Sequence, residues 1–134
     1  MKEHRLDKKV YYHDTDSGGV VYYANYLRHL EEGRTEFLRS LGIDTSEYAG
    51  KGVLFPVVRV EIDYKAPARY GDAIGIYTSV EKIGNASVRF KQQVRKGDTL
   101  LVSGSVVWAC VDENMKAKPV PEEIRKKLSE WAGI

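Results

Sequence analysis

The sequence predicts an α+β fold in which one long helix lies on one face of an antiparallel sheet. Apolar side chains recur every three or four residues over residues 20–41, a spacing typical of an amphipathic helix. Four segments with other patterns follow, separated by short turns: residues 58–65, 74–80, 88–95 and 100–111. The first three alternate apolar with polar side chains, as half-buried strands do. A length of 134 residues fits a single domain, residues 1–134, with its own core.

Two elements are predicted before these strands. A short, partly alternating stretch from Leu6 to Tyr12 indicates a first strand. The helix is predicted from Val20 to Leu41, with Gly42 as the residue that ends it. Gly33 inside this helix costs about 1 kcal/mol relative to alanine, so it indicates a place where another backbone approaches closely.

The later strands are expected to form a meander, because Gly84-Asn85 and Gly97-Asp98 are turn sequences between neighbouring strands. Residues 100–111 are apolar on both faces, which predicts a central strand covered on both sides.

A short last helix is predicted to begin at Pro121, because Ile124, Leu128 and Trp131 share one of its faces. One long and one short helix leave part of such a sheet uncovered. We expect that part to meet a second copy of the chain, which predicts a homodimer.

The composition narrows the class of protein. The chain has 21 Lys and Arg against 19 Asp and Glu, which gives no support for a general nucleic-acid binder. Residues 1–9 lack the apolar core of a signal peptide, and no apolar run reaches membrane-spanning length, so we expect a cytoplasmic protein. The lone Cys110 excludes an internal disulfide framework and a four-cysteine zinc site, and it is expected to be a small core residue.

The segment HDTDSGGVVYYANY, residues 13–26, holds the candidate functional residues. An EF-hand loop starting at Asp14 fails, because Asn25 then stands where a bidentate glutamate is needed. Phosphoryl transfer needs carboxylates from several strand ends in an alternating strand–helix fold, and this chain lacks the alternation. The three histidines form no zinc motif, and no Gly-x-Ser-x-Gly elbow occurs. An ordinary turn or helix cap, without any functional role, remains an alternative. A helix cap uses one such side chain, however, and this loop offers three, those of Asp14, Asp16 and Ser17.

A carboxylate at the start of a helix has a further use. The first N–H groups of a helix are unpaired, so a substrate carbonyl placed there would be polarised by main-chain donors. A neighbouring carboxylate could attack that carbonyl or deprotonate a water. Because a thiol has a pKa of about 8.5 and leaves readily as thiolate, thioester hydrolysis is a reaction that this arrangement could carry.

Residues Val10 to Gly42 resemble the 4-hydroxybenzoyl-CoA thioesterase branch of the hotdog-fold acyl-CoA thioesterases, especially the short bacterial proteins found with cell-envelope genes. The resemblance rests on the motif Tyr-x-Asp-x-Asp-x-x-Gly-x-x-Tyr followed by Asn-Tyr-Leu. The stretch DYKAPARYGD, Asp63 to Asp72, fits the same family, so the resemblance spans the chain. It implies a hotdog fold, in which an antiparallel sheet of about five strands wraps one long helix. It also implies two sheets joined edge to edge in a dimer, and a dimer of dimers as homotetramer.

The resemblance also implies which residues form the active site. Asp16 takes the place of the catalytic carboxylate, as nucleophile or as general base, and Tyr12 that of a tyrosine lining the site. Gly19 and the N–H groups near Tyr23 match the helix start that polarises the thioester carbonyl. Tyr23 itself departs from some relatives, which have a catalytic histidine there, whereas Tyr and Phe occur in others. Asp14 is expected to be a structural partner within the loop.

The implied substrate is an acyl-CoA, hydrolysed without a metal or an organic cofactor. Coenzyme A carries phosphates, so basic side chains are expected near its nucleotide. The candidates are Lys65, Arg69, Arg89 and Lys91. Each of them could equally belong to an ordinary solvated face. The candidates for the acyl pocket, each of which could equally be packing, are Tyr22, Tyr26 and Phe55.

Two other functions stay open. A hotdog module could bind an acyl-CoA or an acyl carrier protein without hydrolysing it, although such a binder gains nothing from Asp16. A hotdog dehydratase usually requires a histidine in the site, and His13 is the only one in the loop. The acyl chain length and the choice between coenzyme A and a carrier protein also stay open.

Overall fold

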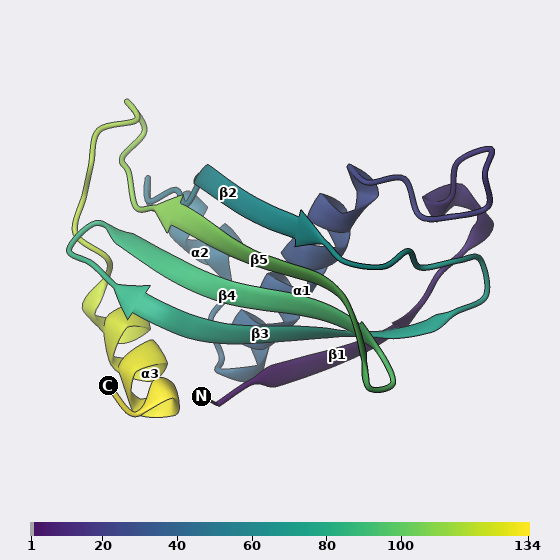
Figure 1. Cartoon of the computed structure of the whole chain (residues 1–134). Helices are drawn as coiled ribbons and strands as arrows, with labels where there is room; N and C mark the ends of the chain where they lie inside the picture. The colour runs from purple at the N-terminus through teal and green to yellow at the C-terminus, as the bar shows by residue number, and fades with distance from the viewer. Residues whose placement is uncertain (1) are drawn as a thin grey trace.

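One antiparallel sheet of five strands lies against the long helix α1 (Asn25–Ser40) in the computed structural model, which describes residues 2–134 (Figure 1). The strands are β1 (His4–Lys9), β2 (Val57–Tyr64), β3 (Ala73–Ile83), β4 (Ser87–Lys96) and β5 (Thr99–Ala109). The shorter helices are α2 (Thr45–Ala49) and α3 (Glu122–Ala132). This architecture confirms the predicted hotdog fold. None of the helices within residues 2–134 is both long enough and apolar enough to cross a membrane.

The strand order in the sheet is β1-β3-β4-β5-β2, so the predicted simple meander is wrong for β2. β3, β4 and β5 are consecutive antiparallel neighbours, as the turn sequences predicted. β2 instead pairs with β5 at the far edge, and residues 65–72 carry the chain back to β3 (Figure 1). Alternation of apolar and polar residues identifies a strand, but it contains no information about which strand becomes its neighbour.

The long helix begins at Asn25 rather than at the predicted Val20. Val20 forms an isolated antiparallel bridge with Arg69, and the next residue, Val21, forms one with Thr15. Extended backbone at these two residues prevents an earlier start of the helix. Their apolar side chains fit the helical spacing, which explains the error.

Two short elements differ from the prediction in a similar way. The first strand ends at Lys9 rather than at Tyr12, because Tyr12–Asp14 form a 3₁₀ turn. Helix α2 was not predicted, since five residues are too few to show a helical period. Its local signal is Asp44, whose side chain accepts the N–H of Ser46 over 2.9 Å as an N-cap.

The buried side chains form two clusters between the helices and the sheet. One cluster contains Phe37 of α1 and Phe90 of β4, and α3 covers it with Ile124 and Leu128. The predicted last helix is thus confirmed, with Pro121 as its N-cap. The other cluster lies nearer the start of α1 and includes Leu30, Ile76 and Val102.

Gly33 lies where α1 crosses β3. A Cβ atom at this position would come within 2.5 Å of Cγ2 of Ile76, which no real contact allows. The predicted approach of another backbone is therefore wrong: Gly33 makes room for side chains of β3 and β4, namely Ile76, Thr78 and Gln92.

Strand β5 is interior in the sheet but is not covered on both sides within one chain. Leu101 and Val106 are buried on the helix side, whereas Ser103, Ser105 and Val107 on the other side are only half-buried. The prediction of a strand covered on both faces is thus not met by one chain alone. Cys110 after this strand is buried, as predicted, and burial raises the pKa of its thiol.

Candidate active site

The motif residues between β1 and α1 fold into a small hairpin. Thr15 and Val21 are bridge partners, and the Asp16 N–H donates to the Val20 carbonyl over 2.9 Å. The Gly19 N–H donates to the Asp16 carbonyl over 3.1 Å, and Gly19 has φ of +77°, a conformation that favours glycine. The predicted functional glycine therefore closes the turn that presents Asp16.

The side chain of Asp16 is exposed at this turn. Its Oδ1 accepts the Gly18 N–H over 2.8 Å, which fixes the carboxylate relative to its own loop. Its charge also reaches the start of α1, because the pKa of Tyr22 is raised, chiefly by the hydroxyl of Tyr23 and in smaller part by Asp16. The second carboxylate oxygen has no hydrogen-bond donor within residues 2–134 and is available for a substrate or a water.

Asp14 has the opposite environment, since its side chain is buried. Its Oδ2 accepts the Tyr11 N–H over 2.9 Å, and its Oδ1 accepts from the Arg28 guanidinium. Its carbonyl oxygen accepts from the Tyr22 N–H over 3.1 Å and from Nδ2 of Asn25 over 2.9 Å. Asp14 therefore ties both ends of the hairpin to the first turns of α1.

The contacts of Asp14 lower its pKa by more than burial raises it. Burial by itself raises the pKa of Asp14, but the hydrogen bonds from the Tyr11 N–H and the Arg28 guanidinium help to hold that pKa below its ordinary value. The carboxylate is thus charged at neutral pH and serves as the anchor of the loop, the role predicted for it.

His29 is a buried member of this cluster that sequence reasoning missed. Its Nδ1 lies 2.9 Å from Nζ of Lys8, whose ammonium can only donate, so Nδ1 is the acceptor and the proton is on Nε2. Nε2 lies 3.5 Å from Oδ1 of Asp14 and has no hydrogen bond within residues 2–134. Burial, and next the Lys8 charge, lower the pKa of His29 against the opposing charges of Asp14 and Glu32, which favours the neutral ring. A signal existed, because His29 adjoins Leu30 on the apolar stripe of the predicted helix.

The start of α1 offers two main-chain donors to a substrate. The Asn25 N–H donates to the Tyr22 carbonyl over 2.8 Å, and the Leu27 N–H donates to the Ala24 carbonyl over 3.2 Å. In the described part of the chain, the N–H groups of Tyr23 and Ala24 have no acceptor. These donors lie at the positive end of the helix, where an oxygen with developing negative charge is stabilised.

The two tyrosines predicted for the site, Tyr12 and Tyr23, differ in their exposure and in their contacts. The side chain of Tyr12 is 77% exposed, and its ring meets that of Tyr70 edge-on at 6.0 Å between centroids. Tyr23 is 60% exposed, its ring meets that of Tyr64 edge-on at 6.2 Å, and its carbonyl accepts the Tyr64 hydroxyl over 3.1 Å. Tyr23 thus joins the start of α1 to the end of β2.

A cavity of about 270 Å³ opens beside Tyr23, between α1 and the end of β2. Its lining includes Tyr26, Tyr64 and the predicted phosphate ligand Lys65. Tyr26 is buried, and its hydroxyl accepts the Ala68 N–H over 3.0 Å, so its ring is a fixed wall. Of the other predicted pocket residues, Tyr22 is exposed near the loop, whereas Phe55 lies elsewhere and packs on Trp108 at 4.5 Å between centroids.

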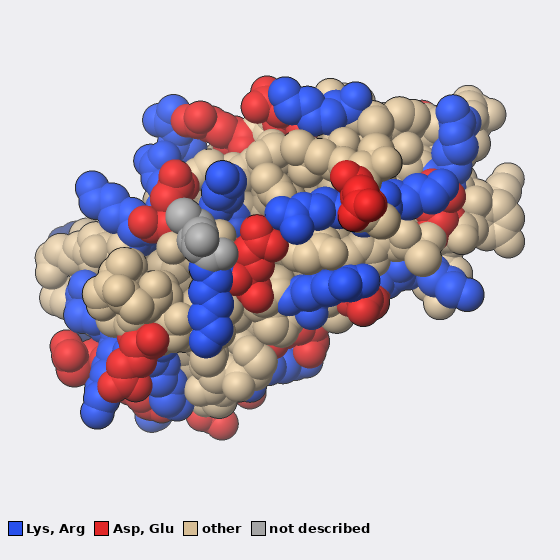
Figure 2. Space-filling view, turned by 60° about the horizontal axis from the view of Figure 1, so that its bottom comes forward, with Lys and Arg blue, Asp and Glu red and all other residues tan. Residues whose placement is uncertain are grey.

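The four predicted phosphate ligands fall into two pairs. Lys65 lines the cavity beside Tyr23, and Arg69 is the bridge partner of Val20 at the base of the hairpin. Arg89 and Lys91 point away from α1, because their neighbour Phe90 packs against the helix. Basic and acidic side chains are interspersed on the face of the described chain that Figure 2 shows, without a patch of one sign. The structure therefore brings the first pair to the loop and places the second pair on the opposite face of the sheet.

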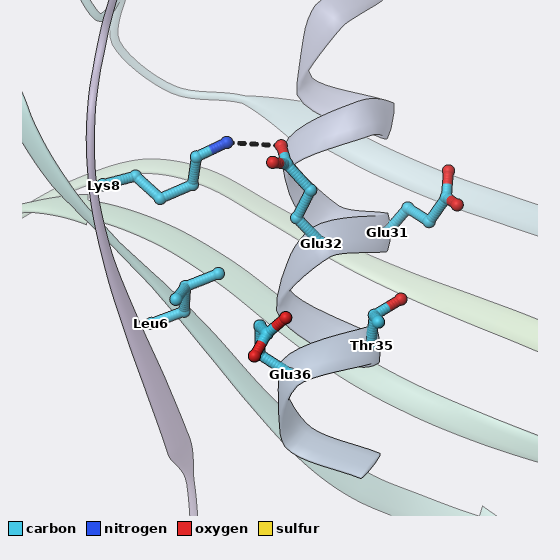
Figure 3. Close-up of a pocket in the computed structure, with 6 residues that line it drawn as sticks. All are labelled: Leu6, Lys8, Glu31, Glu32, Thr35 and Glu36. Atoms are coloured by element: carbon cyan, nitrogen blue, oxygen red, sulfur yellow. Dashed lines mark hydrogen bonds and ion pairs between the residues drawn. The ribbon is translucent and has the colours of Figure 1, made fainter. Parts of the chain in front are cut away.

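Another cavity, of about 290 Å³, lies between β1 and α1 (Figure 3). Glu31, Glu32 and Glu36 line it, and Lys8 pairs with Glu32. No predicted site residue lines this cavity, and its acidic wall repels phosphates. Across residues 2–134, no group of three or more His, Cys, Asp or Glu side chains is arranged to hold a metal ion.

Comparison with known proteins finds relatives that are similar to this chain in sequence and a solved structure that is similar to it in fold. The family model of the thioesterase-like superfamily matches residues 10–128. The acyl-CoA thioesterase YbgC of Haemophilus influenzae is 38% identical over 120 residues, which cover 87% of this chain and 88% of the relative. The acyl-CoA thioester hydrolase YbgC of Escherichia coli O157:H7 is 37% identical over 122 residues, 90% of this chain and 91% of the relative. A thioesterase from Thermus thermophilus, solved with coenzyme A and Zn, superposes with a TM-score of 0.84 at 25% identity, over 97% of this chain and 94% of its own. The chain belongs to the thioesterase-like superfamily.

Proposed function

We propose that this protein hydrolyses acyl-CoA thioesters, with Asp16 as the reacting carboxylate and the Tyr23 and Ala24 N–H groups as the oxyanion site. The observation that supports this most directly is the pair of unengaged N–H groups at the start of α1, next to the hairpin that exposes Asp16. Relatives at 37 and 38% identity are named acyl-CoA thioester hydrolase and acyl-CoA thioesterase, which supports the same reaction.

In the proposed mechanism the thioester carbonyl oxygen accepts hydrogen bonds from the Tyr23 and Ala24 N–H groups. The Asp16 carboxylate either takes a proton from a water that attacks the carbonyl carbon, or attacks that carbon itself. In both routes the carbon–sulfur bond breaks and coenzyme A leaves as a thiolate, which needs little protonation to depart. When Asp16 attacks, water then hydrolyses the acyl-aspartate anhydride. The proposal assigns the coenzyme A phosphates to Lys65 and Arg69, because Lys65 lines the cavity beside Tyr23 and Arg69 is the bridge partner of Val20 at the base of the hairpin. Arg89 and Lys91 stay a prediction that requires the nucleotide to reach the other face of the sheet.

The proposal includes a homodimer built on the free edge of β2. Apolar side chains are exposed along this strand: Val57, Val58, Val60 and Tyr64. An apolar strand edge is normally covered, and a two-fold axis would pair β2 with its own copy in antiparallel orientation. A dimer of dimers and a cytoplasmic location stay expectations from the sequence.

Release of free thiol from acyl-CoA substrates by the purified protein tests the function. Wild-type protein is expected to release one thiol per thioester consumed, and Asp16→Asn is expected to lower kcat by about 100-fold or more, as loss of a general base or nucleophile does. Asp98→Asn, at the exposed turn between β4 and β5, is the matched control and should keep wild-type turnover.

Two outcomes would contradict the proposal. Unchanged turnover in Asp16→Asn, with a native circular dichroism spectrum, would remove Asp16 from the mechanism. Stoichiometric binding of acyl-CoA by the wild type in calorimetry, with no thiol released, would identify a binding module instead.

A further inference from the structure

A third cavity, of about 190 Å³, lies between α1 and the beginning of β2. Phe55, Val57 and Trp108 form an apolar wall, and Arg34 of α1 is the cationic side chain that lines it. Glu31, Thr35 and Thr45 also line it, and Figure 3 shows Glu31 turned away from Lys8 and Glu32, toward the other side of the helix. The cavity therefore combines an apolar wall with a buried guanidinium and with three further polar side chains, those of Glu31, Thr35 and Thr45.

Arg34 is 8% exposed and has few partners for a buried cation. Its Nη1 donates to Oε1 of Gln92 over 2.9 Å. The amide of Gln92 is oriented by its own Nε2, which donates to the Leu30 carbonyl and to Oγ1 of Thr78, each over 2.9 Å. No carboxylate within residues 2–134 lies in ion-pairing distance of Arg34. The guanidinium is thus held by one neutral acceptor.

A buried charge without a partner is costly, and it is retained when a ligand supplies the missing acceptor. Burial lowers the pKa of Arg34, and the charge of Glu31 opposes this shift. Arginine nevertheless stays protonated in proteins. Within residues 2–134 its other N–H groups have no hydrogen-bond acceptor, which suits an oxygen atom on a ligand that enters the cavity.

The β2 dimer would place this cavity beside the reacting thioester of the partner. Within one chain, Val57 and Tyr64 lie at opposite ends of β2, about 23 Å apart at the rise of an extended strand. A short acyl group cannot span that length. Antiparallel pairing of β2 with its own copy sets the Val57 end of one chain against the Tyr64 end of the other. The Arg34 cavity of one copy then adjoins the cavity beside Tyr23 of its partner.

We infer that Arg34 of one copy binds an oxygen at the far end of the acyl group whose thioester lies at Asp16 of the other copy. This inference rests on the proposed function and on the β2 dimer. It makes Arg34 a specificity-determining residue, and it names the preferred substrates as thioesters whose acyl group ends in a carboxylate or a hydroxyl. A carboxylate takes two hydrogen bonds from the guanidinium, whereas a hydroxyl can also donate to Glu31.

Substrates of matched length test the preference. Glutaryl-CoA has a carboxylate in place of the terminal methyl group of pentanoyl-CoA, and 5-hydroxypentanoyl-CoA has a hydroxyl on that carbon. Each is assayed for thiol release in excess of the release without protein. At least one oxygen-bearing substrate is expected to exceed pentanoyl-CoA by tenfold or more in kcat/KM, and which one does so distinguishes the ionic from the hydroxyl ligand. Arg34→Met should bring the ratio near one. Arg39→Met, on an exposed part of the same helix, is the matched control and should keep the wild-type ratio.

The outcomes separate this inference from the proposed function. If the wild type hydrolyses all three thioesters equally, the function stands and the inference fails, whether or not Arg34→Met folds. If the wild type hydrolyses neither these three thioesters nor any other acyl-CoA, the proposed function fails. A strong preference that survives in Arg34→Met would also overturn the role of Arg34.

A mixed dimer tests whether the residue acts across the interface. One tagged copy carries Asp16→Asn and the other carries Arg34→Met, and the heterodimer is purified through both tags. Action across the interface predicts one intact site, and so about half of the wild-type turnover of the preferred substrate per dimer. If Arg34 acted within its own chain, no intact site would form, and the preference would stay lost.

Discussion

Asp14 and Asp16 are two positions apart in the sequence and have opposite surroundings. Asp16 is exposed at a turn, where a substrate can reach it, whereas Asp14 is buried and accepts from Tyr11 and Arg28. The same side chain therefore serves as reactive group at one position and as anchor at the other. Environment alone makes the difference, because each carboxylate has the same intrinsic chemistry.

Replacing Asp14 by asparagine is expected to lower the free energy of unfolding at pH 7 by about 2 kcal/mol, the usual cost of losing hydrogen bonds to a buried charged group. The folded state lowers the pKa of Asp14, so its contribution is present above the unfolded pKa of about 3.9 and is lost as the pH falls through the folded value. The difference between wild type and variant should therefore shrink below about pH 4. Urea unfolding at a series of pH values measures it. A difference that stays constant down to pH 2 would show that the charge of Asp14 is not responsible.

At the scale of the elements, the position of α1 decides the geometry of the site. The helix must approach β3 closely, because Gly33 leaves no room for a Cβ beside Ile76. It must also start late, because Val20 and Val21 are extended in the loop. The late start leaves the N–H groups of Tyr23 and Ala24 without an acceptor in residues 2–134, at the end of the hairpin that carries Asp16.

Substitution of Gly33 by alanine separates packing from helix propensity. Alanine favours a helix by about 1 kcal/mol, but a methyl group 2.5 Å from Cγ2 of Ile76 forces α1 away from the sheet. Overpacking of this kind costs about 1–3 kcal/mol, so we expect a net loss of stability in thermal or urea unfolding. In an Ile76→Ala background the same change should be less harmful, since the clashing atom is gone. Stabilisation by Gly33→Ala in the wild-type background would refute the close contact.

At the scale of the whole molecule, the two edges of the sheet are built differently. β1 exposes Arg5, Asp7 and Lys9, and charges of this kind discourage pairing with another strand. β2 exposes Val58, at 61%, and Val60 along its free edge. The apolar edge is the one suited to a second copy, which is why the proposed dimer uses β2.

Val58→Lys places a charge in that edge and is expected to give a folded monomer. Light scattering after size-exclusion chromatography should show half the wild-type mass, and thiol release should fall with it because each proposed site needs residues of both copies. Arg5→Ala at the β1 edge is the control and should leave the dimer mass unchanged. A wild-type mass that corresponds to one chain would contradict the dimer directly.

Much of the fold followed from local patterns. Alternation located the strands, the turn sequences Gly84-Asn85 and Gly97-Asp98 paired β3 with β4 and β4 with β5, and helical spacing located most of α1 and α3. The placement of β2 beside β5 did not follow, because pairing between distant segments depends on the closing of the whole sheet. The buried His29 and Arg34 were also missed, since a polar residue on an apolar stripe shows its role only when its partners Lys8 and Gln92 are known.

By itself, the sequence determined the period of each main element, the turn in which Asp16 lies and the resemblance that names the chemistry. These depend on residues close together in the chain, whose backbone preferences and spacing act locally. Only the tertiary structure decided that Asp14 is buried while Asp16 is exposed, that the Tyr23 and Ala24 N–H groups lack acceptors within residues 2–134, and that Arg34 lines a cavity while being buried itself. Burial and the pairing of donors with acceptors are set by segments distant in the sequence, and they exist only once the sheet has closed on α1.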